Sequence, residues 1–246
     1  MILGVTASLL LAGCSGVTPT VQPPPSMEPR SPLVASAPPE ASPRLNRFAS
    51  VVAHARLRRV GVYRSRSAKR PFVTLSNPTE VGAPLVFLVT EEMGDWVKAL
   101  LPIRPNGSRG WLRTADVELL EHRFRMKVDL GAHRITVTEG PKTILKAPVG
   151  IGTQDTPTPG GLFYIKELLR PPDPDTIYGP YAYGLSGFSN QLTSFAGGDG
   201  VIGIHGTNAP WTVGQNLSHG CIRMLNHDIE KLVPLLPLGT PVRIVR

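Results

Sequence analysis

The sequence is poor in charged residues and in cysteine. Charged residues are 18% of the 246 and hydrophobic residues 41%, which excludes both a disordered polyelectrolyte and a bundle of membrane-spanning helices. Cysteine occurs only at positions 14 and 221, so no Cys-x-x-Cys pair exists and a closed zinc site is not expected. Proline and glycine are abundant instead, with 26 and 25 residues. Their abundance excludes a long helical fold and favours a Pro-rich linker joined to a loop-rich, mainly β body.

The net charge of +8 is concentrated in one part of the chain. Basic residues exceed acidic ones in residues 44–134, whereas residues 135–246 are balanced. A diffuse basic region attracts anionic polymers in general. It contains no Lys/Arg run and no nucleic-acid-binding motif, so no nucleic-acid partner is expected and the charge is interpreted as solvated surface.

The N-terminus carries the pattern of an export signal followed by a tether. Residues 1–12 form a short apolar run, and Leu11-Ala12-Gly13-Cys14 resembles a bacterial lipobox, although no Lys or Arg precedes the run. This resemblance implies a signal peptide over 1–14, a lipid on Cys14, and a body held at a membrane of the cell envelope, in the periplasm or wall space. Residues 15–44 are predicted to be a Pro-rich linker, about 90 Å long if fully extended.

Residues 45–121 show short β-type runs at 60–63, 84–89, 96–102 and 110–113, with turn residues between them. This spacing predicts a small barrel or sandwich. The order Val-Tyr, Gly-Asp-Trp-Val, Gly-Trp resembles a bacterial SH3-type domain, which implies a wall-binding or positioning module. Trp96 and Trp111 are predicted to pack in its core rather than stack on a ligand.

The second half contains one cysteine near two histidines. Residues 201–204 suit a buried strand that delivers His205 to its end, and Gly206 allows the chain to turn there. With Cys14 lipidated, Cys221 has no partner within the chain, so it serves either an intermolecular bridge or a nucleophile. A thiol attacks as thiolate, and His205 and Arg223 are predicted to lower the pKa of Cys221 below the value of about 8.5 for a free cysteine.

Other uses of these residues are less consistent with the pattern. A zinc site built from His205, His219 and Cys221 would need a fourth ligand, so no metal or cofactor is expected. Papain-like wall peptidases place Cys before His, whereas here His205 comes first, and the Thr-x-Thr-Cys strand of sortases is absent. The remaining histidines belong to no constellation and are interpreted as surface or packing residues: His54, His122, His133 and His227.

His205-Gly206-Thr207, followed by Ser218-His219-Gly220-Cys221-Ile222-Arg223, resembles the signature of the YkuD family of L,D-transpeptidase catalytic domains. Residues 126–130 and 133–137 resemble the opening hairpin of that domain. Residues 149–152 and 156–163 resemble its next strand and Thr-Pro turn. The likeness covers residues 122–246 and implies a β-sandwich with a few short helices.

The resemblance assigns roles to individual residues. Cys221 becomes the nucleophile, and His205 the general base oriented by the carbonyl of Gly206. The amides of Gly220 and Cys221 would form the oxyanion hole. The supporting or substrate-binding positions are Ser218, His219, Arg223, Tyr181, Tyr183 and Trp211.

The implied reaction is peptidoglycan cross-linking. Cys221 would attack a tetrapeptide stem, expel D-alanine and pass the acyl group to an amine on a neighbouring stem, giving a 3→3 cross-link. The alternatives are hydrolysis (L,D-carboxypeptidase), transfer to a protein lysine, and a non-catalytic wall-binding protein. Carbapenem-type β-lactams are expected to acylate Cys221, and the protein is expected to be a monomer.

Overall fold

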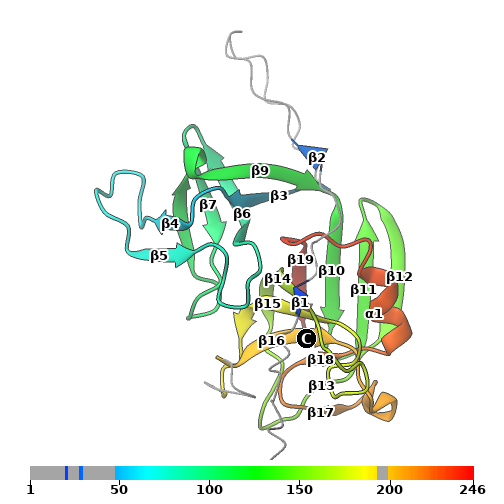
Figure 1. The fold of residues 1–246 in the computed structure, drawn as a ribbon. Helices are drawn as coiled ribbons and strands as arrows, with labels where there is room; N and C mark the ends of the chain where they lie inside the picture. Colours follow the sequence, from blue (N-terminus) through cyan, green and yellow to red (C-terminus); the bar gives the residue numbers. More distant parts are fainter. Residues whose placement is uncertain (1–19, 22–27, 30–47, 193–198) are drawn as a thin grey trace, which may run out of the picture.

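The computed structural model describes residues 20–21, 28–29, 48–192 and 199–246. Two main β-sheets dominate it, and the single α-helix of the described residues, α1 (Asn226–Leu232), lies near the C-terminus (Figure 1). The mainly β fold class is therefore confirmed. Among the described residues, no helix has the length and apolar character needed to cross a membrane.

The first sheet comes from the N-terminal half and has the order β2-β9-β3-β6-β7-β8, in which β2 is Glu28–Pro29. Its turns lie where the turn residues of the sequence predicted them. Gly94 and Gly107 adopt positive φ in the turns between successive strands. A separate pair, β4-β5, packs beside it, and the apolar interior holds Phe87 and Leu112. The SH3-like interpretation of this part stays a prediction. The elements are β3 (Ser50–Ala55), β4 (Arg59–Val62), β5 (Val73–Ser76), β6 (Val86–Met93), β7 (Trp96–Leu100), β8 (Arg109–Arg113), η1 (Thr114–Asp116) and β9 (Val117–His122).

The second sheet comes from the C-terminal half and has the order β12-β11-β10-β19-β14-β15-β16-β18. It opens with the predicted hairpin, β10 and β11, while the C-terminal strand β19 inserts between β10 and β14. Its elements are β10 (Phe124–Asp129), β11 (Arg134–Glu139), β12 (Lys142–Pro148), β13 (Ile151–Gly152), β14 (Gly161–Arg170), β15 (Ala182–Phe188), β16 (Val201–His205), η2 (Pro210–Thr212), β17 (Asn216–Ser218), β18 (Ile222–Arg223), α1 and β19 (Pro241–Val245).

The described parts of the predicted linker are two short strands. β1 (Thr20–Val21) pairs with β14 of the second sheet, and β2 (Glu28–Pro29) pairs with β9 of the first. The predicted signal peptide, with Cys14, lies outside the described residues, as does the rest of the linker.

One hydrophobic cluster is shared by the two halves, and the first half has a second cluster of its own. Val86, Leu88 and Leu100 of the first half pack in the same buried cluster as the interior of the second sheet. The hydroxyl of the fully buried Tyr164 donates to the carbonyl of Val86 at 2.9 Å. The Arg104 guanidinium also crosses the boundary, donating to the carbonyl oxygens of Ser189 and Asp199 at 2.8 Å each. The first half is therefore packed against the second rather than only connected to it.

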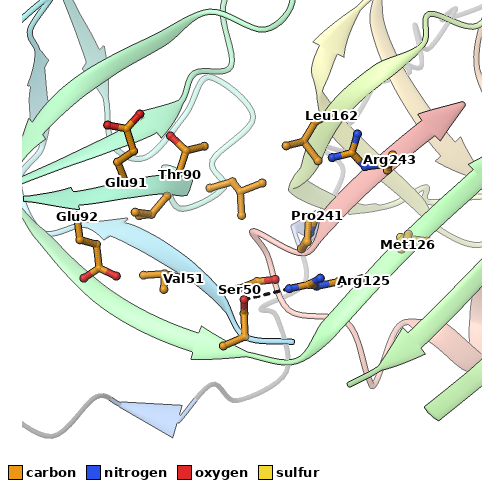
Figure 2. A pocket seen from close by; sticks show the side chains of 13 residues that line it. Ser50, Val51, Thr90, Glu91, Glu92, Arg125, Met126, Leu162, Pro241 and Arg243 are labelled. Atoms are coloured by element: carbon orange, nitrogen blue, oxygen red, sulfur yellow. Dashed lines mark hydrogen bonds between the residues drawn. The ribbon is translucent and has the colours of Figure 1, made fainter. Parts of the chain in front are cut away.

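A cavity of about 500 Å³ lies where the halves meet (Figure 2). Glu91 and Glu92 of β6 stand on one side, and Arg125 and Arg243 of the second sheet stand on the other. Arg125 donates to the carbonyl of Ala49, which ties this wall to the chain entering β3. Neither His205 nor Cys221 lines this cavity.

Candidate active site

Two parallel strands bring the predicted histidine and cysteine together. β16 ends at His205, and β18 runs beside it with His205 opposite Arg223. This register places Cys221 next to Gly203, whose N–H donates to Sγ at 3.4 Å. Side chains alternate along a strand, so Gly203 and His205 face away from the core side occupied by Ile204. A Cβ on Gly203 would lie 3.8 Å from the His205 ring and 3.9 Å from Sγ, with the Tyr183 carbonyl oxygen at 3.3 Å, so both side chains lie close to the same face of Gly203.

His205 is held as a neutral imidazole in one tautomer. Its Nδ1 lies 2.6 Å from the carbonyl oxygen of Gly206. A carbonyl can only accept, so Nδ1 carries the proton and Nε2 keeps its lone pair. Burial lowers the pKa of His205 to about 4, the bond to Gly206 opposes this, and Arg223 lowers it further. The side chain is therefore an uncharged base at neutral pH.

Cys221 is half-buried and is a thiol at rest. Burial raises the pKa of Cys221, and this outweighs the lowering by the Gly203 N–H and by Arg223. The prediction of a lowered thiol pKa was wrong, because desolvation of a thiolate costs more here than the neighbouring positive groups return. The resting site is thus a neutral pair, thiol and imidazole.

The turn before Cys221 is closed by Ser218. Its hydroxyl accepts the N–H of Gly220 at 3.1 Å and donates to the carbonyl of Cys221. Gly220 has φ +112, a conformation that side-chain-bearing residues rarely adopt. Its amide is engaged by Ser218, so the prediction that Gly220 lends an N–H to the oxyanion hole is corrected. Among the described residues the Cys221 N–H has no acceptor, and it remains the available donor.

The Thr-Pro segment braces this turn from the other side. The Thr153 N–H donates to the Ser218 carbonyl at 3.0 Å, and the Thr156 hydroxyl donates to the same oxygen at 3.3 Å. The Gly152 N–H in turn donates to the Thr158 hydroxyl at 2.9 Å. The predicted strand and Thr-Pro turn thus support the cysteine from a distant part of the sequence.

Arg223 supplies the positive field of the site. Its backbone exchanges two hydrogen bonds with Gly150, at 2.8 and 2.9 Å, which fix the start of its side chain. The buried Nε of Arg223 has no hydrogen-bond partner within the described residues. The same part of the chain holds no cluster of His, Cys, Asp and Glu suited to a metal ion.

The part of the chain that contains this site matches a known domain. A family model for the L,D-transpeptidase catalytic domain, YkuD, matches residues 123–244. These residues belong to the YkuD family.

Relatives of the L,D-transpeptidase domain occur in several bacteria. The YkuD protein of Bacillus subtilis (strain 168) is 37% identical over 124 residues, which are 50% of this chain and 66% of that protein. The YbiS protein of Escherichia coli (strain K12) is 31% identical over 120 residues, 44% of this chain and 39% of that protein. Among solved structures, Bd1075 of Bdellovibrio bacteriovorus is 28% identical, with 50% of this chain and 47% of that chain covered at a TM-score of 0.40. The match thus spans just under two thirds of the first protein and about two fifths of the second.

The aromatic residues predicted around the groove of the L,D-transpeptidase domain occupy different environments. Tyr183 is 0% exposed and faces the core, so its predicted contact with substrate is wrong. Tyr181 is half-buried below the guanidinium of Arg170, and its carbonyl accepts the Gly206 N–H at 3.2 Å. Trp211 is 69% exposed in η2, in the loop between His205 and Cys221. His219 is exposed beside the nucleophile turn.

Sequence reasoning missed two residues of the L,D-transpeptidase site. The ring of Tyr178 meets the His205 ring edge-on, with centroids 5.1 Å apart. Burial raises the pKa of Tyr178, and a smaller electrostatic effect of Cys221 acts in the same direction. Asn226 accepts the N–H of Thr207 through Oδ1 at 2.7 Å. The only signal in the sequence for Tyr178 was its position among the prolines and tyrosines of residues 171–183. Asn226 had no such signal.

Proposed function

We propose that this chain is a peptidoglycan L,D-transpeptidase that acts through a thioester on Cys221. Family members act on peptidoglycan stem peptides. The observation that carries the proposal is the β16–β18 pairing, which brings a neutral His205 of fixed tautomer and the Cys221 thiol each within 4 Å of the Cβ position of Gly203. Acyl transfer by a thiol requires a nucleophile and a base in this relation.

In the first half-reaction the thiol proton moves to Nε2 of His205 as Sγ attacks the carbonyl carbon of the third stem residue. The negative charge that develops on the carbonyl oxygen is stabilised by the Cys221 N–H, the available amide donor of the turn. The C–N bond to the terminal D-alanine then breaks. His205 returns its proton to the departing amine, and a thioester remains.

In the second half-reaction an amine of a neighbouring stem attacks the thioester carbonyl. His205 takes a proton from this amine, and the C–S bond breaks to regenerate the Cys221 thiol. The product is a 3→3 cross-link and no cofactor is consumed. Arg223, whose positive charge acts on both His205 and Cys221, is suited to attract a carbonyl or carboxylate of the stem towards the reacting atoms.

The neutral resting pair is compatible with this chemistry. A thiolate formed in advance would have to be desolvated by the same burial that raises the thiol pKa. Proton transfer concerted with attack avoids that separate cost, because the charge passes onto the carbonyl oxygen as it develops.

The proposal is tested with purified protein and a disaccharide-tetrapeptide substrate, with products separated and weighed by mass spectrometry. Cross-linked dimers that are absent with Cys221→Ala support transpeptidation. Tripeptide without dimer identifies an L,D-carboxypeptidase, and acyl transfer to an added lysine peptide identifies a protein acceptor. Unchanged cross-linking by Cys221→Ala would overturn the thioester mechanism. Wild-type protein that forms neither dimer nor tripeptide would leave a non-catalytic wall-binding role.

We further propose that the chain works in the cell envelope. The apolar run, the Leu-Ala-Gly-Cys pattern and the proline-rich stretch favour a protein anchored through a lipid on Cys14, which we expect to be a monomer. The basic N-terminal half then serves as the wall-facing module. Metabolic labelling with a radioactive fatty acid, compared between wild type and Cys14→Ala, tests the anchor.

A further inference from the structure

The orientation of His205 depends on a single peptide unit, the one between Gly206 and Thr207. The carbonyl of this unit accepts the Nδ1–H of His205 at 2.6 Å. The N–H of the same unit donates to Oδ1 of Asn226 at 2.7 Å. A trans peptide is planar, with its C=O and N–H pointing in opposite directions, so fixing one end fixes the other.

Asn226 is itself held firmly. It is the first residue of α1, and this helix packs Ile229 and Leu232 into the core of the catalytic domain. The backbone before it is also tied to the site, because the Met224 N–H donates to the His205 carbonyl at 2.8 Å. The Asn226 amide therefore offers its oxygen from a rigid element.

Two glycines make room for this oxygen. A Cβ on Gly206 or on Gly179 would clash with Asn226 Oδ1. Asn226 thus lies between the chain that follows His205 and the loop that carries Tyr178, whose ring meets the His205 ring edge-on. It contacts both segments that determine where the imidazole lies.

We propose that Asn226 is a positioning residue that acts through the Gly206–Thr207 peptide to hold His205 in the tautomer with Nε2 free. The inference rests on the proposed function only in naming His205 as the base. The chain of hydrogen bonds runs from the His205 Nδ1–H to the Gly206 carbonyl, and from the Thr207 N–H to Asn226. Each bond polarises the next, so Asn226 strengthens the carbonyl as an acceptor and makes Nε2 more basic.

The test uses the full chain with ¹⁵N-labelled histidine and reads the His205 tautomer by NMR, beside the rate at which iodoacetamide alkylates Cys221. Asn226→Ala is expected to mix the tautomers and slow alkylation at neutral pH by about tenfold, the size of one general-base interaction weakened rather than deleted. Asn226→Asp keeps an acceptor oxygen, so it is expected to restore the single tautomer and raise the pKa of His205.

A matched control is Asn190→Ala, an exposed asparagine of the loop after β15. It is expected to leave both readings at the wild-type value. A folded Asn226→Ala with an unchanged tautomer and alkylation rate would overturn the inference. If Asn226→Ala does not fold, the Asn226→Asp variant alone provides the test. A folded Asn226→Asp protein in which His205 populates both tautomers would contradict the proposed positioning role of Asn226.

Neither the tautomer measurement nor the alkylation rate requires a substrate. Failure of this inference can therefore be distinguished from failure of the proposed function. If the wild-type protein forms neither tripeptide nor dimer, the proposed reaction is disproved, but the tautomer result remains valid. A normal reaction with an unchanged tautomer in Asn226→Ala removes only the role of Asn226.

Discussion

At the scale of single residues, the site is governed by the balance between burial and charge. Both reacting groups lie close to Arg223, which favours a thiolate and disfavours an imidazolium. Burial raises the pKa of Cys221 more than Arg223 lowers it, so the two effects oppose each other there. For His205 both burial and Arg223 lower the pKa. The outcome is a site with no net charge on its reacting pair at neutral pH.

This balance predicts the pH profile of Cys221 alkylation. The rate is expected to rise with pH to a midpoint above about 8.5, the value of an unperturbed cysteine, because burial raises the pKa of the Cys221 thiol. Arg223→Gln is expected to move the midpoint higher, since Arg223 lowers the pKa of this thiol. Iodoacetamide labelling followed by mass spectrometry measures both, with Arg243→Gln as a control at the interdomain cavity. A wild-type midpoint below 8.5 contradicts the assignment.

At the scale of elements, Cys221, the proposed nucleophile, is held by a turn rather than by a strand. The Ser218 hydroxyl closes the turn, Gly220 supplies its positive φ, and the Thr-Pro segment braces it. These interactions keep the Cys221 amide and thiol in a fixed relation, which an oxyanion donor and a nucleophile both need.

Ser218→Ala is expected to leave the Gly220 N–H and the Cys221 carbonyl without their partner. The loss costs about 1–3 kcal/mol of unfolding free energy and lowers the acylation rate. Gly220→Ala is expected to cost a similar amount, because φ +112 is strained for alanine and its Cβ would lie 3.2 Å from Ile202. Urea unfolding and the rate of carbapenem adduct formation on Cys221 measure these effects. Ser65→Ala, exposed in the first half, serves as the control.

At the scale of the whole molecule, the shared core predicts that the two halves unfold together. Tyr164→Phe removes the buried bond to the Val86 carbonyl and is expected to cost about 1–3 kcal/mol. Trp96 and Trp111 report the first half, and protection of Cys221 from alkylation reports the second. With Trp211→Phe as background, the two probes are expected to give one common transition. Separate transitions would show that the shared core does not couple the halves.

The same buried packing predicts acid sensitivity. Burial lowers the pKa of His122, at the junction of the halves, to about 4, and that of His205 to about 4. The unfolded chain therefore binds more protons than the folded one, so stability falls as the pH drops from about 6.5 towards 4. At pH 5 the loss is about 2 kcal/mol for each histidine relative to neutral pH. Urea unfolding at pH 7.5 and pH 5 measures it, and His122→Gln should remove the part of the loss that belongs to His122, leaving the parts of His205 and of His54, whose pKa burial also lowers.

Much of this architecture could be predicted from local sequence. The β runs near 60, 86, 96 and 110 became strands because alternating apolar residues and turn glycines act over a few positions. The pair His205 and Cys221 was identifiable because its residue types and spacing carry the chemistry. Insertion of β19 between β10 and β14 could not be predicted, since it joins residues more than 70 positions apart.

The amino-acid sequence by itself determined the mainly β class, the candidate nucleophile and base, and the order of the segments, because these follow from residue type and local pattern. Only the tertiary structure decided that the Cys221 thiol is protonated at rest and that Tyr183 is buried in the core. It also decided that the Gly220 N–H donates to Ser218 and that Asn226 accepts a hydrogen bond from the peptide beside His205. These properties depend on how deeply each group is buried and on which distant groups meet it. Burial and long-range contacts exist only once the chain has folded.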